Sequence, residues 1–134
     1  MAHPKEISIH SHQRTEFIKL DGPVAKAIEE SGLKDGVCHV YVPHTTAGVT
    51  INEGADPDVV ADILNRLAHL VPHHAGYAHV EDNADSHIKA TLVGASVTVL
   101  VRDGKPMLGT WQSIFFCEFD GPRQREVWVK VVEG

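Results

Sequence analysis

Alternation of apolar and polar residues predicts that strands dominate this chain. Residues 5–10 (KEISIH) alternate throughout, which is typical of a strand that is buried on one face only. Residues 126–132 (EVWVKVV) alternate in the same way, and residues 96–102 (SVTVLVR) form another strong strand pattern. Residues 36–42 are largely apolar on both faces, so we expect that strand in the centre of its sheet. Further strands are predicted at residues 13–20, 50–52 and 114–119.

Two helices are predicted where an aspartate is followed closely by a proline. Asp21 can cap the first helix, and Asp56 can cap a second helix that Pro72 stops. The second helix carries an amphipathic stripe of apolar residues at helical spacing, namely Val60, Ile63, Leu64, Leu67 and Val71. A third, short helix is expected from Ser86, as its cap, to Leu92.

Turn signals indicate how these elements connect. Asp103-Gly104 predicts a hairpin, and we place its second strand at residues 114–119. Residues 72–86 form a polar loop, and a loop this long in a compact domain is usually functional or disordered. Hairpin signals outnumber strand–helix–strand signals, and no repeat or linker interrupts the chain. The pattern predicts a single α+β domain over residues 1–134, antiparallel and β-sandwich-like, with two or three short helices.

Composition and charge restrict the classes of partner. The net charge of −6 disfavours nonspecific binding to nucleic acid, which relies on a basic surface. No apolar run is long enough to span a membrane and the start does not resemble a signal peptide, so we expect a soluble, cytoplasmic protein. A phosphorylated small molecule needs only local donors and remains compatible. Cys38 and Cys117 are expected to be buried thiols, although a disulfide between them stays open.

The candidate chemistry begins in residues 44–53 (HTTAGVTINE), which we interpret as a polar loop that follows a strand broken by Pro43. In a cleft, Glu53 would act as a general acid or base, and outside one it would be an exposed carboxylate. Thr45 and Thr46 offer hydroxyls and backbone amides to an oxyanion or a phosphate, unless they simply lie at a strand edge.

Two histidines in the later polar region raise the possibility of a composite site. His44, His79 and His87 together would hold Zn²⁺ or a similar ion with one position open, or would bind an anion when protonated. Their spacing matches no single-helix metal motif, so three separately bonded histidines are the alternative. Carboxylate and amide side chains around the second loop could orient such imidazoles through their other ring nitrogen.

Aromatic and basic residues near the end of the chain add further candidates. Trp111 would stack on a planar ring, or would be a core aromatic, and Gln112 would read ring nitrogens. Arg123 and Arg125 would bind anions, or would pair with the excess of acidic residues.

Three segments, read in order, resemble the YjbQ family, also called secondary thiamine-phosphate synthase-like proteins. They are HTTAGVTINEGADPDV (44–59), EDNADSHIKA (81–90) and LGTWQSIFFCEFDGPRQREV (108–127), and the resemblance covers nearly the whole chain. It implies an α+β, β-sandwich-like subunit that assembles into a homotrimer. It also implies a pocket formed by His44, His79 and His87, with Glu53 and Asn83 nearby, that holds a metal or an anion.

The same resemblance implies an activity. Members of the family are associated with joining a hydroxymethylpyrimidine diphosphate to a thiazole phosphate, a reaction regarded as secondary. We therefore expect a divalent metal (Zn²⁺ or Mg²⁺) or a phosphate or sulfate at the histidines. The alternatives are a metal-dependent phosphoester hydrolase and a non-catalytic ligand-binding trimer. The residues expected to act on or contact the bound molecules are Glu53, His44, Thr45, Thr46, Asn83, Trp111 and Gln112.

Overall fold

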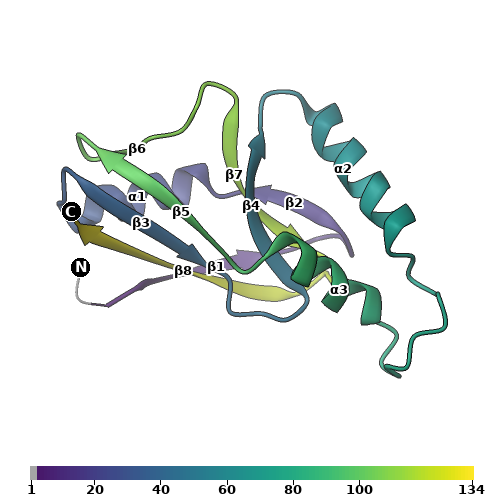
Figure 1. Cartoon of the computed structure of the whole chain (residues 1–134). Helices are drawn as coiled ribbons and strands as arrows, with labels where there is room; N and C mark the ends of the chain where they lie inside the picture. The colour runs from purple at the N-terminus through teal and green to yellow at the C-terminus, as the bar shows by residue number, and fades with distance from the viewer. Residues whose placement is uncertain (1–2) are drawn as a thin grey trace.

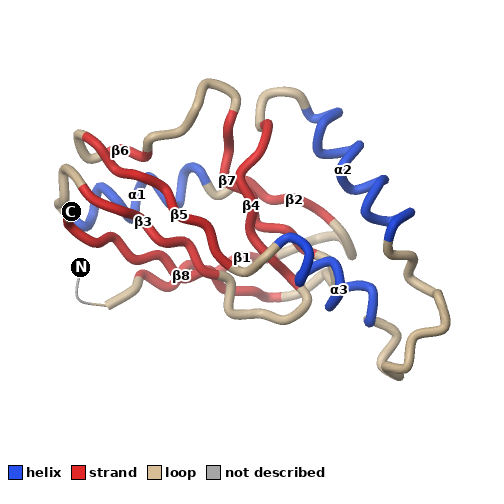
Figure 2. Tube along the Cα trace, viewed as in Figure 1, coloured by secondary structure: helices blue, strands red, loops and turns tan. Residues whose placement is uncertain are grey.

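Two antiparallel sheets and three helices make up residues 3–134, the part of the chain that the computed structural model describes (Figure 1). The strands are β1 (Lys5–His10), β2 (Glu16–Lys19), β3 (Gly36–Tyr41), β4 (Ala47–Glu53), β5 (Ser96–Arg102), β6 (Lys105–Pro106), β7 (Gln112–Glu118) and β8 (Gln124–Glu133). The helices are α1 (Asp21–Ser31), α2 (Pro57–Leu70) and α3 (Ala84–Val93). One sheet has the order β1-β8-β3-β5-β6 and the other β2-β7-β4, so the predicted α+β class is confirmed (Figure 2).

The main core lies between the two sheets and α1. Val40 of β3 is paired with Val129 of β8, and both side chains are fully buried. They belong to one apolar cluster with Ile28 of α1 and with Phe116 of β7. Burial of each such side chain contributes roughly 1.5–3 kcal/mol relative to exposure. The two sheets are therefore held together by side chains from both of them and from α1.

A second, smaller cluster lies on the other side of β7, where α2 and α3 pack. Phe115 and Cys117 of β7 form it with Ala90 of α3. Val60 and Leu67 of α2 pack against this cluster. No residue of α2 is fully buried, although the helix has a strongly apolar stripe on one side. In Figure 1, α2 lies at the edge of the molecule, away from the larger sheet. No helix in residues 3–134 is long and apolar enough to cross a membrane.

The outer face of the five-stranded sheet remains exposed. As predicted, β3 is interior to its sheet, between β8 and β5. Only one of its faces is buried, however, since Tyr41 is 46% exposed. On neighbouring strands of the same face, Leu100 is 55% and Val132 is 44% exposed. An apolar surface is thus left uncovered on the isolated chain.

Two of the three predicted helix caps are wrong, and both residues have tertiary partners instead. Asp56 does cap α2, because its Oδ1 accepts a hydrogen bond from the Asp58 amide at 2.9 Å. The carboxylate of Asp21 instead accepts from the backbone N–H of Ile114 at 2.7 Å, which fixes α1 to β7. Ser86 lies inside α3, and its hydroxyl donates to the carbonyl of Phe119 at 2.5 Å.

Two predictions of strand pairing also need correction. The strand predicted at residues 50–52 is confirmed but is longer, because β4 covers residues 47–53 along β7. Most of the expected polar loop 44–53 is therefore strand. The Asp103-Gly104 turn does form a hairpin, but its second strand is the two-residue β6. The predicted partner, residues 114–119, is β7 and pairs with β2 and β4 in the other sheet.

A buried ionic network pins α3 to the loop before β2. Asp85 is fully buried and accepts two hydrogen bonds from the guanidinium of Arg14, at 3.0 and 3.1 Å. It also accepts one from the buried ammonium of Lys89 at 2.9 Å. Burial raises the pKa of the Asp85 carboxyl, but the bonds from Arg14 and Lys89 outweigh it and leave the pKa at about 2.

We therefore predict that Asp85 contributes stability that is lost in acid. Its folded pKa lies below the ordinary value of about 3.9, so the contribution is complete above about pH 4 and disappears as the pH falls through 2. The loss is roughly 2–3 kcal/mol by linkage. Urea unfolding of the wild type and of Asp85→Asn/Lys89→Met, which leaves no lysine unpaired, measures it. The difference between the two proteins should shrink from pH 7 to pH 2, and a constant difference would contradict the assignment.

Candidate functional site

His44 lies in the short segment between β3 and β4. Its Nε2 accepts a hydrogen bond from the backbone N–H of Glu126 at 2.9 Å, so a neutral ring carries its proton on Nδ1. Burial lowers the pKa of His44, and the nearby charge of Arg125 lowers it further. At neutral pH the ring is therefore an uncharged donor through Nδ1–H.

Arg125 and Glu118 form a buried ion pair directly beneath this segment. The Arg125 Nε donates to Glu118 Oε1 at 2.9 Å, and a second guanidinium nitrogen donates to the hydroxyl of Thr46 at 2.9 Å. Ser11 donates its hydroxyl to the same carboxylate at 2.6 Å. Burial raises the pKa of Glu118, but the bonds from Arg125 and Ser11 outweigh it, so the pKa is lowered overall.

This arrangement decides between two alternatives left by the sequence. Arg125 is only 5% exposed and pairs with an acid, so it is not a free anion-binding residue. Arg123 is also paired, with Asp120 at 2.9 Å. Thr46 is 6% exposed and supports Arg125 through its hydroxyl. We conclude that these residues position the His44 segment rather than line an open site.

An open depression of about 440 Å³ separates the His44 segment from α3. It brings His44 and Thr45 together with His87, which the sequence places more than forty residues away. We call it the histidine depression, and its lining residues are His44, Thr45, Ala47, His87, Ala90, Thr91, Gly94 and Ala95.

His79 adjoins this depression through His87. The two rings meet edge to face, with centroids 5.2 Å apart and an interplanar angle of 83°. The Nε2 of His79 lies 2.9 Å from the side-chain oxygen of Asn83, whose amide nitrogen donates to Asp120 at 2.9 Å. Because the amide of Asn83 is oriented by Asp120, the Nε2 of His79 is the donor in its bond. The chain of contacts fixes both the ring and its tautomer.

These contacts test whether the three histidines suit a metal. The Nε2 lone pair of His44 is already engaged by a backbone N–H. Within residues 3–134, the three ligand atoms that lie within 4.8 Å of one another belong to His73, His74 and Asp82 instead. A metal shared by His44, His79 and His87 does not fit this arrangement.

The remaining predicted residues lie at the other end of β4. Glu53 is in register with Gln112 of β7, and Gly54 donates its N–H to the carbonyl of Trp111 at 2.9 Å. Glu53 is six residues beyond Ala47, which is roughly 20 Å at about 3.3 Å per strand residue. Trp111 is 65% exposed and is therefore not a core aromatic. Within one chain, these residues do not reach the histidine depression.

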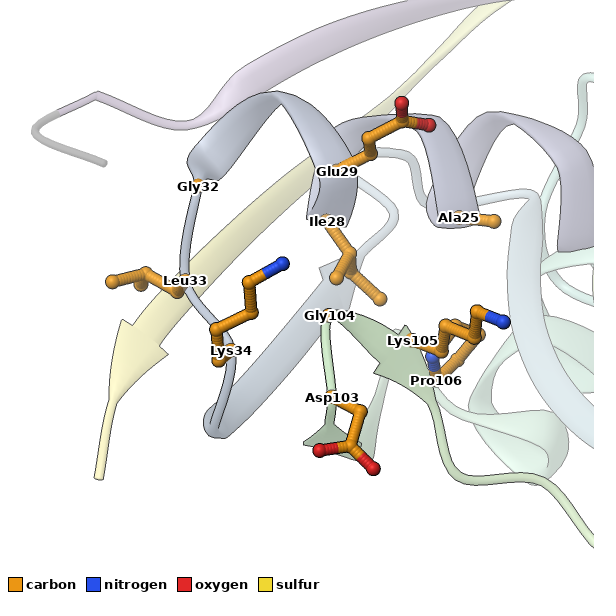
Figure 3. Close-up of a pocket in the computed structure, with 10 residues that line it drawn as sticks. All are labelled: Ala25, Ile28, Glu29, Gly32, Leu33, Lys34, Asp103, Gly104, Lys105 and Pro106. Atoms are coloured by element: carbon orange, nitrogen blue, oxygen red, sulfur yellow. The ribbon is translucent and has the colours of Figure 1, made fainter.

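A larger hollow of about 670 Å³ lies between the end of α1 and the β5–β6 hairpin (Figure 3). Its walls are mainly backbone and aliphatic surface, with Glu29, Lys34, Asp103 and Lys105 as isolated charged side chains. None of its lining residues is a histidine. The histidine depression remains the stronger candidate for chemistry, because perturbed titratable groups in a cleft indicate function.

Glu118, Ser11 and Asp120 support the site but were not among the predicted residues. Glu118 is the charged residue in an otherwise apolar strand run, FFCEF, and an acid in such a run requires a buried partner. The sequence therefore indicates that Glu118 has a buried partner. Ser11 and Asp120 carry no comparable signal, since both lie at ordinary loop positions beside a strand.

The fold and the depression define an α+β protein with an imidazole-lined site. Residues 5–134 match the family described as UPF0047 protein YjbQ-like. A UPF0047 protein of Methanocaldococcus jannaschii is 54% identical over 92% of this chain and 90% of its own length. YugU of Bacillus subtilis is 45% identical over 96% and 98%. This chain therefore belongs to the YjbQ/UPF0047 family, as its motifs indicated.

Solved structures agree with the fold. A YjbQ/UPF0047 protein of Clostridium acetobutylicum superposes with a TM-score of 0.94 at 50% identity, covering 96% of this chain and 99% of that one. A relative from Sulfolobus solfataricus, described as a protein of unknown function, gives 0.94 at 32% identity, with 98% and 97% covered. These relationships establish the family and the fold, and they assign no reaction.

We predict that His44 stays neutral at pH 7. Because burial and Arg125 lower its pKa, its titration midpoint should lie below the ordinary value of about 6.5. Its Nδ1 should carry the proton. Two-bond ¹H–¹⁵N NMR spectra across a pH series report both the midpoint and the tautomer, and His44→Ala assigns the resonance. A midpoint at or above 6.5, or a proton on Nε2, would be the contrary result.

Proposed function

We propose that the histidine depression binds the phosphate groups of a small phosphorylated molecule and that the chain catalyses a thiamine-phosphate synthase-like transfer. One observation carries the proposal: His44 and Thr45 from one segment and His87 from another line one open depression, with His79 against His87. Its volume of about 440 Å³ suits a small ligand, since ligand pockets typically measure about 300–1,000 Å³.

The local electrostatics favour an anion. His44 offers Nδ1–H, and Thr45 offers a hydroxyl. His87, in the first turn of α3, adds a second imidazole to the depression. The carboxylate of Asp85 in the same turn is offset by Arg14 and Lys89. A diphosphate would gain hydrogen bonds here without facing an unpaired acid from that turn.

The transfer needs stabilisation of the leaving group more than it needs a base. The ring nitrogen of the thiazole forms a bond to the methylene carbon of the pyrimidine, the bond from that carbon to the diphosphate oxygen breaks, and the electron pair leaves with pyrophosphate. The attacking thiazole nitrogen carries no proton, so no base is needed to deprotonate it. Hydrogen bonds to the departing diphosphate therefore lower the barrier, and the distance of Glu53 from the depression is no obstacle.

The matching assay uses a pyrimidine diphosphate and a thiazole phosphate. We expect thiamine phosphate to form, and His44→Ala and His87→Ala to lower turnover by about 10²-fold or more, as the loss of a charge-stabilising donor typically does. His69→Ala is the control, because His69 is exposed on α2 and bonds the carbonyl of Asn65. Equal turnover in all variants would refute the site.

Two other outcomes identify the rival functions. Pyrophosphate or phosphate release that does not require the thiazole acceptor would replace the transferase with a phosphoester hydrolase. Saturable binding of the pyrimidine diphosphate with no product, whichever divalent metal is added, would leave a non-catalytic binding protein.

We also propose that the chain assembles into a homotrimer. The exposed apolar face of the five-stranded sheet, formed by Tyr41, Leu100 and Val132, supports an interface, as do the partly covered α2 and its apolar stripe. The indole nitrogen of Trp128, stacked on Tyr41, is buried without a hydrogen-bond partner in residues 3–134. In a cyclic trimer, the Glu53 end of one chain could approach the depression of its neighbour.

Light scattering tests the assembly. We expect a mass near three times 14.6 kDa for the wild type. Leu100→Glu should lower it towards 14.6 kDa, because a charge would be buried in the interface. Val80→Glu, at a position that is 92% exposed in the loop after α2, should leave the mass unchanged. A wild-type mass of 14.6 kDa would contradict the trimer.

A further inference from the structure

Two histidines and an aspartate converge in the loop between α2 and α3. The Nε2 of His73 lies 3.4 Å from one carboxylate oxygen of Asp82, and the Nδ1 of His74 lies 3.3 Å from the other. The two imidazoles are stacked with centroids 4.1 Å apart and an interplanar angle of 17°. All three ligand atoms fall within 4.8 Å of one another, on the wall of a hollow of about 210 Å³.

These separations resemble the edges of a metal coordination shell. Charge-assisted hydrogen bonds between nitrogen and a carboxylate are typically about 2.7–2.9 Å long, and both contacts are longer. Two ligands at about 2.0–2.1 Å from a tetrahedral Zn²⁺ lie roughly 3.4 Å apart, which follows from the tetrahedral angle. The separations of 3.4 and 3.3 Å, each to a different oxygen of Asp82, are close to this ligand-to-ligand distance.

The donor set indicates which kind of ion would bind. Two imidazole nitrogens and one carboxylate suit Zn²⁺ and neighbouring divalent transition metals, whereas Mg²⁺ and Ca²⁺ prefer oxygen ligands alone. The backbone carbonyl of Asp82 also lies 2.8 Å from the Nε2 of His73. In the metal-free loop, a proton on Nε2 makes that bond, and binding of the ion would displace this proton to solvent.

The position of the three residues gives the site a structural consequence. His73 and His74 begin the loop and Asp82 ends it, so one ion would join both ends. His79 lies in the segment between these ligands, and Asn83, which orients His79, directly follows Asp82. We propose that residues 73, 74 and 82 form a Zn²⁺-type site, distinct from the histidine depression, that orders the loop carrying His79.

Metal titration of chelator-treated protein tests this site. Co²⁺, followed by its visible absorption, and Zn²⁺, followed by calorimetry, should each bind at one ion per chain. His73→Ala and Asp82→Asn should weaken binding about 10-fold or more, since each removes a direct ligand. Asp82 has a φ of +65°, a conformation that asparagine also accepts, so Asp82→Asn keeps the loop backbone. His69→Ala is the matched control and should bind as the wild type does.

His44→Ala separates the two possible locations. Retained binding in His44→Ala, with loss in His73→Ala, supports the loop site. Loss in His44→Ala with normal binding in His73→Ala would place the ion at the histidine depression and overturn the proposal, as would no saturable binding at all. Added Zn²⁺ should also protect residues 72–83 from limited proteolysis in the wild type and not in Asp82→Asn. Equal protection in both would count against the loop-ordering role.

Discussion

The buried pair of Arg125 and Glu118 is the interaction on which the site depends. It joins β8 of the larger sheet to β7 of the smaller one. Two buried charges are tolerated only when they are paired and hydrogen-bonded, so the segments that surround them must come together when the chain folds. Through Thr46, the arginine holds the start of β4, next to His44. The same carboxylate accepts the N–H of Asp120, whose side chain bonds Asn83. Both histidine-bearing segments are thus anchored to one ion pair.

Much of the fold could be predicted from local pattern. The strands at 5–10 and 96–102 have the predicted bounds, because a half-buried strand shows its period of two directly in the sequence. The start of β4 was interpreted as loop because Ala47 and Gly48 are small and do not alternate with polar residues. Position 48 requires glycine, because a Cβ atom there would lie only 2.6 Å from the carbonyl oxygen of Gly94. Such close packing is a tertiary property, and local sequence does not contain it. Asp21 shows the same limit, since its partner is ninety-three residues away.

The candidate site could be predicted in part for a related reason. His44, His79, His87 and Asn83 do gather, and the family motifs pointed to them before their contacts were known. Glu53, Trp111 and Gln112 gather separately. Glu53 is the ninth residue after His44, and this separation in sequence spans a short distance in a loop that folds back but a long one in an extended strand. The polar-loop interpretation of residues 44–53 allowed for only a short strand at residues 50–52, so it placed the acid near the imidazoles. The full strand, which begins at Ala47, moves Glu53 to the far end.

The length of β4 has a thermodynamic consequence. Side chains at its two ends are roughly 20 Å apart and share no partner in the described chain. Substitutions at His44 and Glu53 should therefore have additive effects on the free energy of unfolding. Any coupling energy between the two ends would have to come from outside the strand. A double-mutant cycle across β4 should thus give an interaction energy near zero for a single subunit. It should give a measurable interaction energy only when a neighbouring subunit contacts both ends. Non-additive changes in the free energy of unfolding on substitution of His44 and Glu53 would therefore measure coupling between chains, not within one chain.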